Sequence, residues 1–351
     1  MENIRLGFVG VGGMGQMAHL RNYLTIPGCT VAAIAEIRPQ TARLVADRHG
    51  IAGVYADHRE MLAKEQLDGV VASQQFGHHA ALLPEIYPHV RRVLTEKPLC
   101  INADVGAKLV TAAAAAGCTH MVGYHKRSDP ATIWAKAKIA ELTASGRLGK
   151  LTYVRILMPA GDWIANGRIG LLSANDKPAG PSPESEPRPS DLDEATYKKY
   201  VDFVNYYIHQ VNLMRHLIGG PYQVTYAEKT GVLLAVESAA GIAGTIEMTP
   251  YRTTIDWQEE ALVCFEKGWV RLTLPAPLAT NRAGTVEVYS DPDGGPPERT
   301  SPTLPWVHAM RQQALNFVAV CRGEIAPPCA AAEAVEDLRI ARDYIRLRFG
   351  V

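Results

Sequence analysis

The hydrophobic pattern over the first third of the chain alternates between short apolar runs and longer amphipathic stretches. Apolar runs predict strands at residues 4–9, 30–35, 53–55, 68–72, 91–95 and 118–122, and amphipathic stretches predict helices at 16–24, 39–49, 58–64, 78–87 and 102–116. Strands that alternate with helices are typical of a doubly wound parallel sheet, which binds ligands at the carboxyl ends of its strands. We therefore expect an α/β domain over residues 1–123.

The pattern changes in the second part of the chain, residues 124–351, which we assign to a second domain. Strand-like runs lie at 150–158, 222–236, 240–248, 260–266, 268–274 and 285–289, and helical stretches at 204–217, 306–322 and 330–347. An insert at residues 159–200 is rich in Pro, Gly, Ser and charge and lacks periodicity. A loop this long inside a compact domain is usually functional or disordered.

A glycine-rich turn follows the first predicted strand and opens the first predicted helix. Gly10-Val11-Gly12-Gly13-Met14-Gly15 fits the dinucleotide fingerprint G-x-G-x-x-G. In that fingerprint the first glycine permits the tight turn, the second lets the backbone approach a pyrophosphate, and the third lets helix and strand pack closely. The helix N-terminus then offers free N–H groups to the pyrophosphate.

The second predicted strand ends in Glu36, about 20 residues beyond Gly15, where the fingerprint places an acid that binds the adenosine ribose. A carboxylate there accepts a hydrogen bond from the 2′-hydroxyl and repels a 2′-phosphate, which favours NAD over NADP. Arg38 argues in the other direction, because a nearby arginine can accept that phosphate.

The composition limits the remaining classes of function. Lys plus Arg and Asp plus Glu both number 36, so the chain has no general field for nucleic acid or an anionic membrane. The six cysteines and the histidines show no zinc-ligand spacing, so we expect no metal, and the scattered cysteines favour free thiols in the cytoplasm. The first apolar run is too short to span a membrane.

A second motif lies at the fifth predicted strand and reads Val93-Leu94-Thr95-Glu96-Lys97-Pro98-Leu99. Together with the glycine turn, its Glu-Lys-Pro resembles the glucose-fructose oxidoreductase / inositol dehydrogenase / rhizopine catabolism (Gfo/Idh/MocA) family. Weaker matches are His79, Gly123-Tyr124-His125-Lys126-Arg127 for a Gly-Tyr-x-x-Arg strand end, and Asn205 to Asn212 for Asp-x-Gly-x-His-x-x-Asp. The resemblance implies an N-terminal Rossmann domain and a C-terminal α+β domain with a large, mostly antiparallel sheet. It also implies a homodimer or homotetramer and a cis Lys97–Pro98 bond.

The resemblance implies a site for NAD and for a carbohydrate. Expected at the cofactor are Gly10, Gly12, Gly13, Met14, Gly15, Glu36, Arg38, Gln74, His79, Glu96 and Lys97. Expected at the substrate are Lys97, Tyr124, His125, Arg127, Asp162, Trp163, Asn205 and His209. His209 is the expected base, because imidazole titrates near neutral pH, and Lys97 the group that bonds the reacting oxygen.

Asn205 and Asn212 stand where the family has Asp, so they orient His209 without stabilising an imidazolium by charge. His209 as a satisfied core histidine and Arg127 as a solvated strand end are the structural alternatives. The start of the insert, with Asp162 and Trp163, suits a sugar, and a surface or oligomer contact is the competing interpretation.

Three functions remain open. The first is an NAD-dependent dehydrogenase that oxidises a secondary hydroxyl of a sugar, polyol or glycoside. The second is a redox-neutral enzyme with retained NAD that acts through a 3-keto intermediate or exchanges electrons between two aldoses. The third is a non-catalytic NAD-binding regulator.

Overall fold

The computed structural model describes residues 3–180 and 183–351, which form two compact units. The first unit consists of Met1–Tyr124, Gly167–Pro189 and Gln313–Val335, and the second of His125–Asn166, Ser190–Gln312 and Glu336–Val351. The insert predicted at 159–200 is thus divided between the units. Its last residues are helical, which the sequence analysis did not expect.

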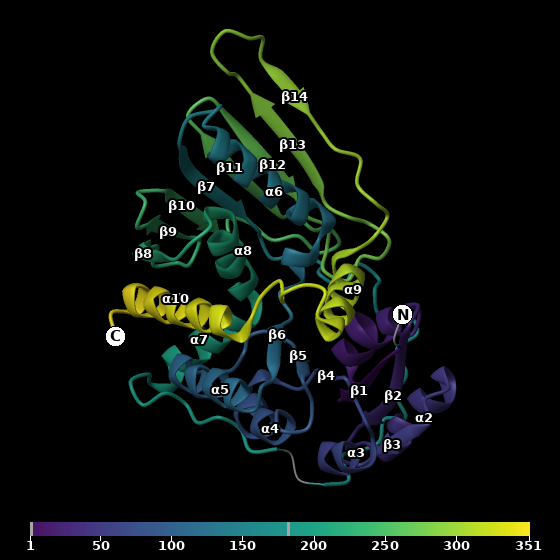
Figure 1. Ribbon diagram of the computed structural model, residues 1–351. Helices are drawn as coiled ribbons and strands as arrows, with labels where there is room; N and C mark the ends of the chain where they lie inside the picture. Colours follow the sequence, from purple (N-terminus) through teal and green to yellow (C-terminus); the bar gives the residue numbers. More distant parts are fainter. Residues whose placement is uncertain (1–2, 181–182) are drawn as a thin grey trace. The chain divides into compact units, whose positions relative to one another are not determined.

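The first unit contains a six-stranded parallel sheet (Figure 1). The strands are β1 (Ile4–Val9), β2 (Cys29–Ala35), β3 (Gly53–Tyr55), β4 (Gly69–Ala72), β5 (Arg92–Thr95) and β6 (Thr119–Val122). Their order, β3-β2-β1-β4-β5-β6, is the Rossmann order, with the switch point between β1 and β4. The strands are mostly apolar because both faces of the sheet are covered.

Helices and a stretch near the C-terminus cover this sheet. The elements are η1 (Gly15–Leu20, a π-helix), α1 (Arg21–Tyr23), α2 (Pro39–His49), α3 (His58–Lys64), η2 (Phe76–His78), α4 (His79–Ile86), α5 (Ala103–Ala115) and part of α9 (Ala309–Arg322). Phe317 of α9 packs on Tyr23, which packs on Phe8 of β1, with ring centroids 6.4 and 5.5 Å apart. The C-terminal part of the chain therefore completes the core of the first unit.

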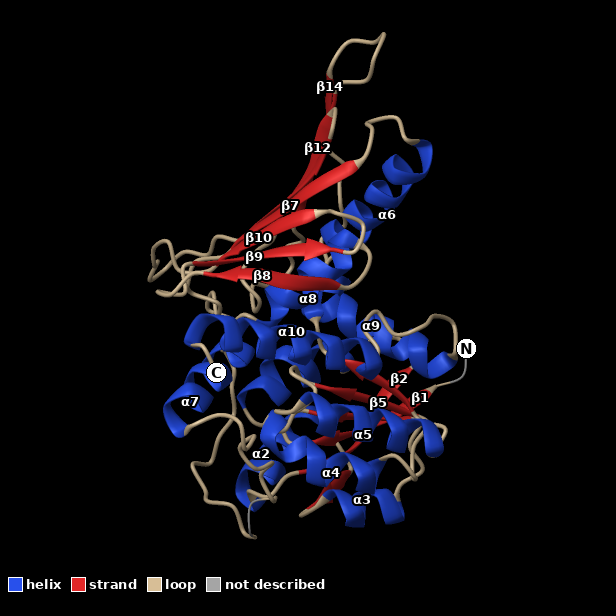
Figure 2. Ribbon diagram, turned by 90° about the vertical axis from the view of Figure 1, so that its left-hand side faces the viewer, coloured by secondary structure: helices blue, strands red, loops and turns tan. Residues whose placement is uncertain are grey.

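The second unit contains an eight-stranded sheet, with α6 and α8 on one side of it (Figure 2). Its strands, in sheet order, are β14 (Glu298–Thr300), β13 (Thr285–Ser290), β12 (Gly268–Thr273), β11 (Glu260–Phe265), β7 (Leu151–Leu157), β10 (Ala243–Glu247), β9 (Leu233–Ser238) and β8 (Tyr222–Ala227). All neighbours pair antiparallel except β7 and β10. The expected mostly antiparallel sheet is confirmed.

The helical elements of the second unit are η3 (His125–Ser128), α6 (Pro130–Ser145), α7 (Glu194–Tyr206), α8 (Ile208–Ile218) and most of α10 (Ala331–Phe349), from Glu336 on. The helix predicted over 204–217 is broken at Tyr207, which ends α7 and begins α8. The strand predicted over 222–236 is two strands, because the chain turns at Gly231 with φ +88°. The helix predicted from residue 306 begins at Ala309.

Candidate functional site

The glycine turn of the first unit lies at the carboxyl end of β1. Gly10 has φ +87°, and a Cβ on Gly15 would lie 2.5 Å from the carbonyl oxygen of Gly10, so the backbone requires glycine at both positions. A Cβ on Gly12 would meet nothing closer than 3.7 Å, and one on Gly13 nothing within 4 Å. The turn, with Met14 just before η1, thus leaves open space where a dinucleotide pyrophosphate would lie.

Glu36 at the end of β2 is fixed beside this turn. Its carboxylate accepts the Val11 N–H at 2.9 Å and two bonds from the Arg38 guanidinium at 2.8 and 2.9 Å. Burial acts to raise the Glu36 pKa, but the bonds from Arg38 and Val11 outweigh it, so the pKa is lowered. Glu36 is therefore an ionised acceptor, and Arg38 is paired with it. These residues fit the adenosine ribose of a dinucleotide.

Two polar side chains of the β4 loop support the turn from the other side. Ser73 donates to the Gly10 carbonyl oxygen at 2.7 Å, and the Gln74 amide packs so close to Gly10 that a Cβ there would clash with it. His79, fully buried at the start of α4, bonds the Leu99 carbonyl oxygen through Nδ1 at 2.8 Å. Burial lowers the pKa of His79 to about 4, so it is neutral at neutral pH.

The Glu96-Lys97-Pro98 segment follows β5, and its Lys97–Pro98 bond is cis, as expected. Glu96 lies 2.6 Å from His19 Nε2 and also accepts the Lys97 N–H at 3.2 Å. Burial acts to raise the Glu96 pKa, but His19 and Lys97 outweigh it, so the pKa is lowered. The sequence analysis missed His19, although a polar residue one turn after the glycine loop was a usable signal. The pair joins η1 to the loop that holds Lys97.

A segment that we call the strap, residues 167–180 and 183–189, lies along the carboxyl edge of the parallel sheet in the first unit. It can be followed in teal past α2 (Figure 1). Leu172 exchanges two backbone hydrogen bonds with the Gln16 side chain, at 2.9 and 3.0 Å. Glu186 accepts the Ile101 and Asn102 N–H groups at 2.9 and 2.7 Å. The strap thus contacts the loops that follow β1 and β5, where dinucleotides bind in this class of fold.

In the second unit, His209 at the start of α8 lies against His125 of η3, with ring centroids 4.6 Å apart at 76°. Next to His209, Gln210 of the same helix contacts a buried ion pair. Lys126 pairs with Glu259, which also accepts from Gln210 at 2.8 Å. The two histidines therefore rest on an ordered polar base.

A buried chain of hydrogen bonds continues along α8. Arg127 donates to Asn212 at 2.7 Å, Asn212 donates to Asp337 at 2.6 Å, and Arg215 donates to Asp337 at 2.9 Å. Arg127 and Asn212 are thus integral to the second unit's interior. Asn205 is exposed near the end of α7, on a different helix from His209.

The other predicted substrate residues lie in two places. Tyr124 is buried at the end of the first unit's N-terminal segment. In the second unit the Asp162 carboxylate accepts the Ile164 and Ala165 N–H groups at 3.0 and 3.1 Å. The backbone carbonyl oxygen of the half-buried Trp163 accepts the Leu278 N–H at 3.1 Å. Asp162 thus organises a turn in which Ala165 and Asn166 have positive φ.

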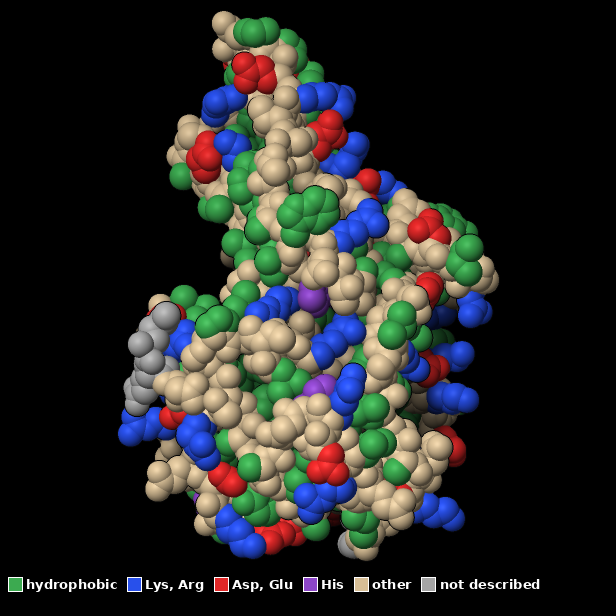
Figure 3. Space-filling view, turned by 90° about the vertical axis from the view of Figure 1, so that its right-hand side faces the viewer, with side chains coloured by type: hydrophobic (Ala, Val, Ile, Leu, Met, Phe, Trp, Pro, Cys, Tyr) green, Lys and Arg blue, Asp and Glu red, His purple; other side chains and the backbone are tan. Residues whose placement is uncertain are grey.

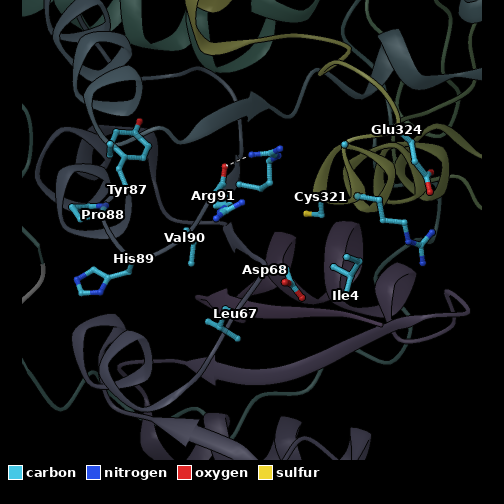
Figure 4. A pocket seen from close by; sticks show the side chains of 14 residues that line it. Ile4, Leu67, Asp68, Tyr87, Pro88, His89, Val90, Arg91, Cys321 and Glu324 are labelled. Carbon is cyan, nitrogen blue, oxygen red and sulfur yellow. Dashed lines mark hydrogen bonds between the residues drawn. The ribbon is translucent and has the colours of Figure 1, made fainter. Parts of the chain in front are cut away.

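A cavity of about 870 Å³ opens at the opposite, amino edge of the parallel sheet (Figure 4). It is lined by the first residues of β1 and β5, by the segments that precede β4 and β5, and by the end of α9, with Asp68, Arg91 and Cys321 among the lining residues. Because dinucleotides bind at the carboxyl edge, this cavity is separate from the coenzyme site.

Acidic and basic side chains are intermixed on the face drawn in Figure 3. Among residues 3–180 and 183–351, no group of three or more His, Cys, Asp or Glu side chains is placed to hold a metal ion. Over the same residues no helix is both long and apolar enough to cross a membrane.

Comparison with known proteins agrees with this geometry. Residues 4–124 match the family described as oxidoreductase family, NAD-binding Rossmann fold. The chain is 30% identical over 304 residues to inositol 2-dehydrogenase of Burkholderia cenocepacia, covering 82% of this chain and 80% of that protein. It is 34% identical over 149 residues to inositol 2-dehydrogenase of Rubrobacter xylanophilus, covering 42% of each, so this match spans about two fifths of that enzyme.

A solved structure of a putative NADPH-dependent oxidoreductase from Desulfitobacterium hafniense superposes with a TM-score of 0.76 at 12% identity, covering 98% of this chain and 95% of the other. Fold and glycine turn together are those of an NAD(P)-binding Rossmann domain. The chain belongs to the Gfo/Idh/MocA family.

Proposed function

We propose that the protein is an NAD-dependent oxidoreductase that oxidises a secondary hydroxyl of a polyol, sugar or glycoside, with inositols as the first substrates to test. The observation that carries the proposal is the glycine turn with ionised Glu36 beside it, in a chain 30% identical to an inositol 2-dehydrogenase over 304 residues. Gly12, Gly13 and Glu36 would hold the coenzyme, which when bound accepts the hydride.

The protein's own part of the reaction is to position the alcohol and remove its proton. His209 is the proposed base, because imidazole can accept a proton near neutral pH. It is held by α8, and His125 packs against its ring. Lys97, on a loop fixed by the Glu96–His19 pair, is the proposed donor to the reacting oxygen. Tyr124, Arg127, Asp162, Trp163 and Asn205 remain proposed substrate residues.

The proposal is tested by mixing the protein with NAD⁺ and a panel of inositols, sugars and glycosides and following NADH by absorbance. We expect turnover with at least one compound. Lys97→Met and His209→Ala should each lower kcat by roughly 10²–10⁴-fold, the usual contribution of acid–base groups. Retained NAD⁺ binding in both variants is the control. Turnover that survives both substitutions would refute the assigned roles.

A second candidate function is a redox-neutral enzyme that retains NAD through each cycle. The strap favours this candidate. Its hydrogen bonds to Gln16, Ile101 and Asn102 lie along the carboxyl edge of the parallel sheet, which we call the coenzyme edge, and would slow the release of a bound dinucleotide. NAD found in the purified, denatured protein, with no net NADH formed during product formation, would select this candidate over a dehydrogenase.

We also propose that the chain forms a homodimer or homotetramer through the face of the eight-stranded sheet that α6 and α8 leave uncovered. Tyr153 and Arg155 on β7 and Trp269 on β12 remain only half-buried, although these strands lie in the middle of a sheet. Light scattering of the purified protein should give a mass of two or four chains. A single-chain mass would contradict this assembly.

A further inference from the structure

The strap contains an acid, Asp176, whose position at α2 bears on the choice of coenzyme. The Asp176 carboxylate accepts the Gln40 N–H at 2.8 Å, the Thr41 N–H at 3.2 Å and the Thr41 hydroxyl at 2.5 Å. It comes from a segment more than a hundred residues away in the chain. Asn175, which precedes it, has φ +57° and so turns the strap there.

Every donor in the first turn of α2 is accounted for. Pro39 has no N–H, Gln40 and Thr41 donate to Asp176, and Ala42 donates to the Arg38 carbonyl oxygen at 2.9 Å. The helix has no cap from its own Arg38 side chain. A helix N-terminus with free N–H groups is a ready site for phosphate, but here the chain's own carboxylate occupies it.

The nearby cation is also engaged. The Arg38 guanidinium makes two bonds to Glu36, and α2 begins only three residues after Glu36. If Glu36 bonds the 2′-hydroxyl of the adenosine ribose, a phosphate on that oxygen would lie near Arg38 and the first turn of α2. The Arg38 guanidinium and the N–H groups of α2 could neutralise that phosphate, but both are already paired with carboxylates, those of Glu36 and Asp176.

From this arrangement we propose that Asp176 is a specificity-determining residue that excludes NADP by filling the 2′-phosphate position at the N-terminus of α2. The proposal rests on the proposed function, since it assumes that the first unit binds a nicotinamide dinucleotide. It assigns the strap a task that neither the glycine turn nor Glu36 performs alone. Glu36 selects for a free 2′-hydroxyl, and Asp176 repels the phosphate and denies it hydrogen-bond donors.

Equilibrium binding of NAD⁺ and of NADP⁺, measured by titration calorimetry of the full chain, tests the proposal without any turnover. In Asp176→Asn, which keeps an acceptor oxygen and loses the charge, NADP⁺ should bind about tenfold more tightly, in the range expected of a single charge at a helix terminus. In Asp176→Ala, which also frees the donors, the gain should be larger. The Kd for NAD⁺ should change less than about threefold in both.

Two further variants separate this role from loosening of the strap. Glu184→Gln removes an equal charge from an exposed strap position that lies off α2. Thr41→Val removes the hydroxyl that bonds Asp176 and accepts the Ala174 N–H, and leaves the carboxylate in place. Both should keep the wild-type ratio of the two Kd values.

A ratio unchanged within twofold in Asp176→Asn and Asp176→Ala overturns the proposal, as does equal weakening of both nucleotides. Wild-type protein that prefers NADP⁺ also overturns it, and with it the proposed preference for NAD, but leaves the oxidoreductase function standing. Wild-type protein that binds neither nucleotide refutes the proposed function as well.

Discussion

The coenzyme edge of the first unit and the His209 region of the second unit are built on different principles. At the coenzyme edge the backbone determines the structure, because Gly10 and Gly15 allow a turn that no other residue fits. The Val11 N–H of that turn donates to Glu36, and the N–H groups at the start of α2 donate to Asp176. Around His209 the structure is held by buried side chains, above all by the hydrogen bonds that run from Arg127 through Asn212 to Asp337.

This difference determines how each region should respond to mutation. A backbone turn tolerates changes that respect its φ values and open space, whereas a buried ion pair loses much stability when one partner is removed, because the other charge stays buried and unpaired. Substitutions in the two regions should therefore differ in size and in kind.

The largest effect on stability is expected from Asp337→Ala in the His209 region. Asp337 is fully buried and bonds both Arg215 and Asn212, so its removal leaves a buried guanidinium and should lower the free energy of unfolding by about 3–5 kcal/mol. Urea unfolding measures this. The matched control is Asp343→Ala on the same helix, an exposed residue 3.9 Å from Arg346, which should change stability by less than about 0.5 kcal/mol. Similar losses in both variants would contradict the prediction.

A pH-dependent effect of nearly the same size is expected beside the coenzyme edge, from His79. Its pKa is about 4 in the folded protein and about 6.5 in the unfolded chain, so the unfolded state binds the proton first as the pH falls. Stability should therefore decrease between pH 6.5 and pH 4, by about 3 kcal/mol from this group.

His79→Asn, which keeps a donor toward the Leu99 carbonyl oxygen, should remove this share of the pH dependence. His120, whose pKa burial lowers to about 3, stays in both proteins and leaves a residual slope. Unfolding curves recorded from pH 7 to pH 4 that are parallel in the two proteins would show that His79 does not contribute.

A smaller effect should separate the two kinds of glycine in the turn. Gly15→Val places a Cβ 2.5 Å from the Gly10 carbonyl oxygen and should cost about 1–3 kcal/mol of stability. Gly13→Val adds a side chain in open space, so the thermal midpoint should stay near wild type while NAD⁺ binding weakens at least tenfold. Thermal unfolding and calorimetry measure the two quantities. A destabilised Gly13→Val, or one that binds NAD⁺ normally, would contradict the distinction.

Most of the first unit could be predicted from the sequence, because its signals are local. Each strand is an apolar run next to an amphipathic helix, and the glycine turn, Glu36 and Glu96-Lys97-Pro98 are contiguous motifs whose geometry follows from residue type. His19 was missed because its partner, Glu96, is distant in the chain and no periodicity links the two.

The second unit was harder to predict, because its polar network joins residues from η3, α8 and α10. No spacing rule indicates that Asn212 bonds Arg127 and Asp337, and the break at Tyr207 separates Asn205 from the helix of His209. The strap was equally hidden, since its composition resembles that of a surface loop and only tertiary contacts place Asp176 on α2.

The central claim is that a hydride passes from a carbinol carbon to the nicotinamide of a coenzyme held by the glycine turn. The most direct test uses inositols and glucosides deuterated at carbon. The protein is incubated with NAD⁺ and these compounds, and the nicotinamide coenzyme, free and bound, is recovered and weighed by mass spectrometry. If NAD is released after each turnover, we predict deuterium in the NADH that accumulates. If NAD is retained, we predict deuterium in the reduced coenzyme only when the reaction is acid-quenched within a single turnover, before the deuteride returns to the product. Reduced coenzyme without deuterium, or no reduced coenzyme at any quench time across the whole panel, would contradict the claim.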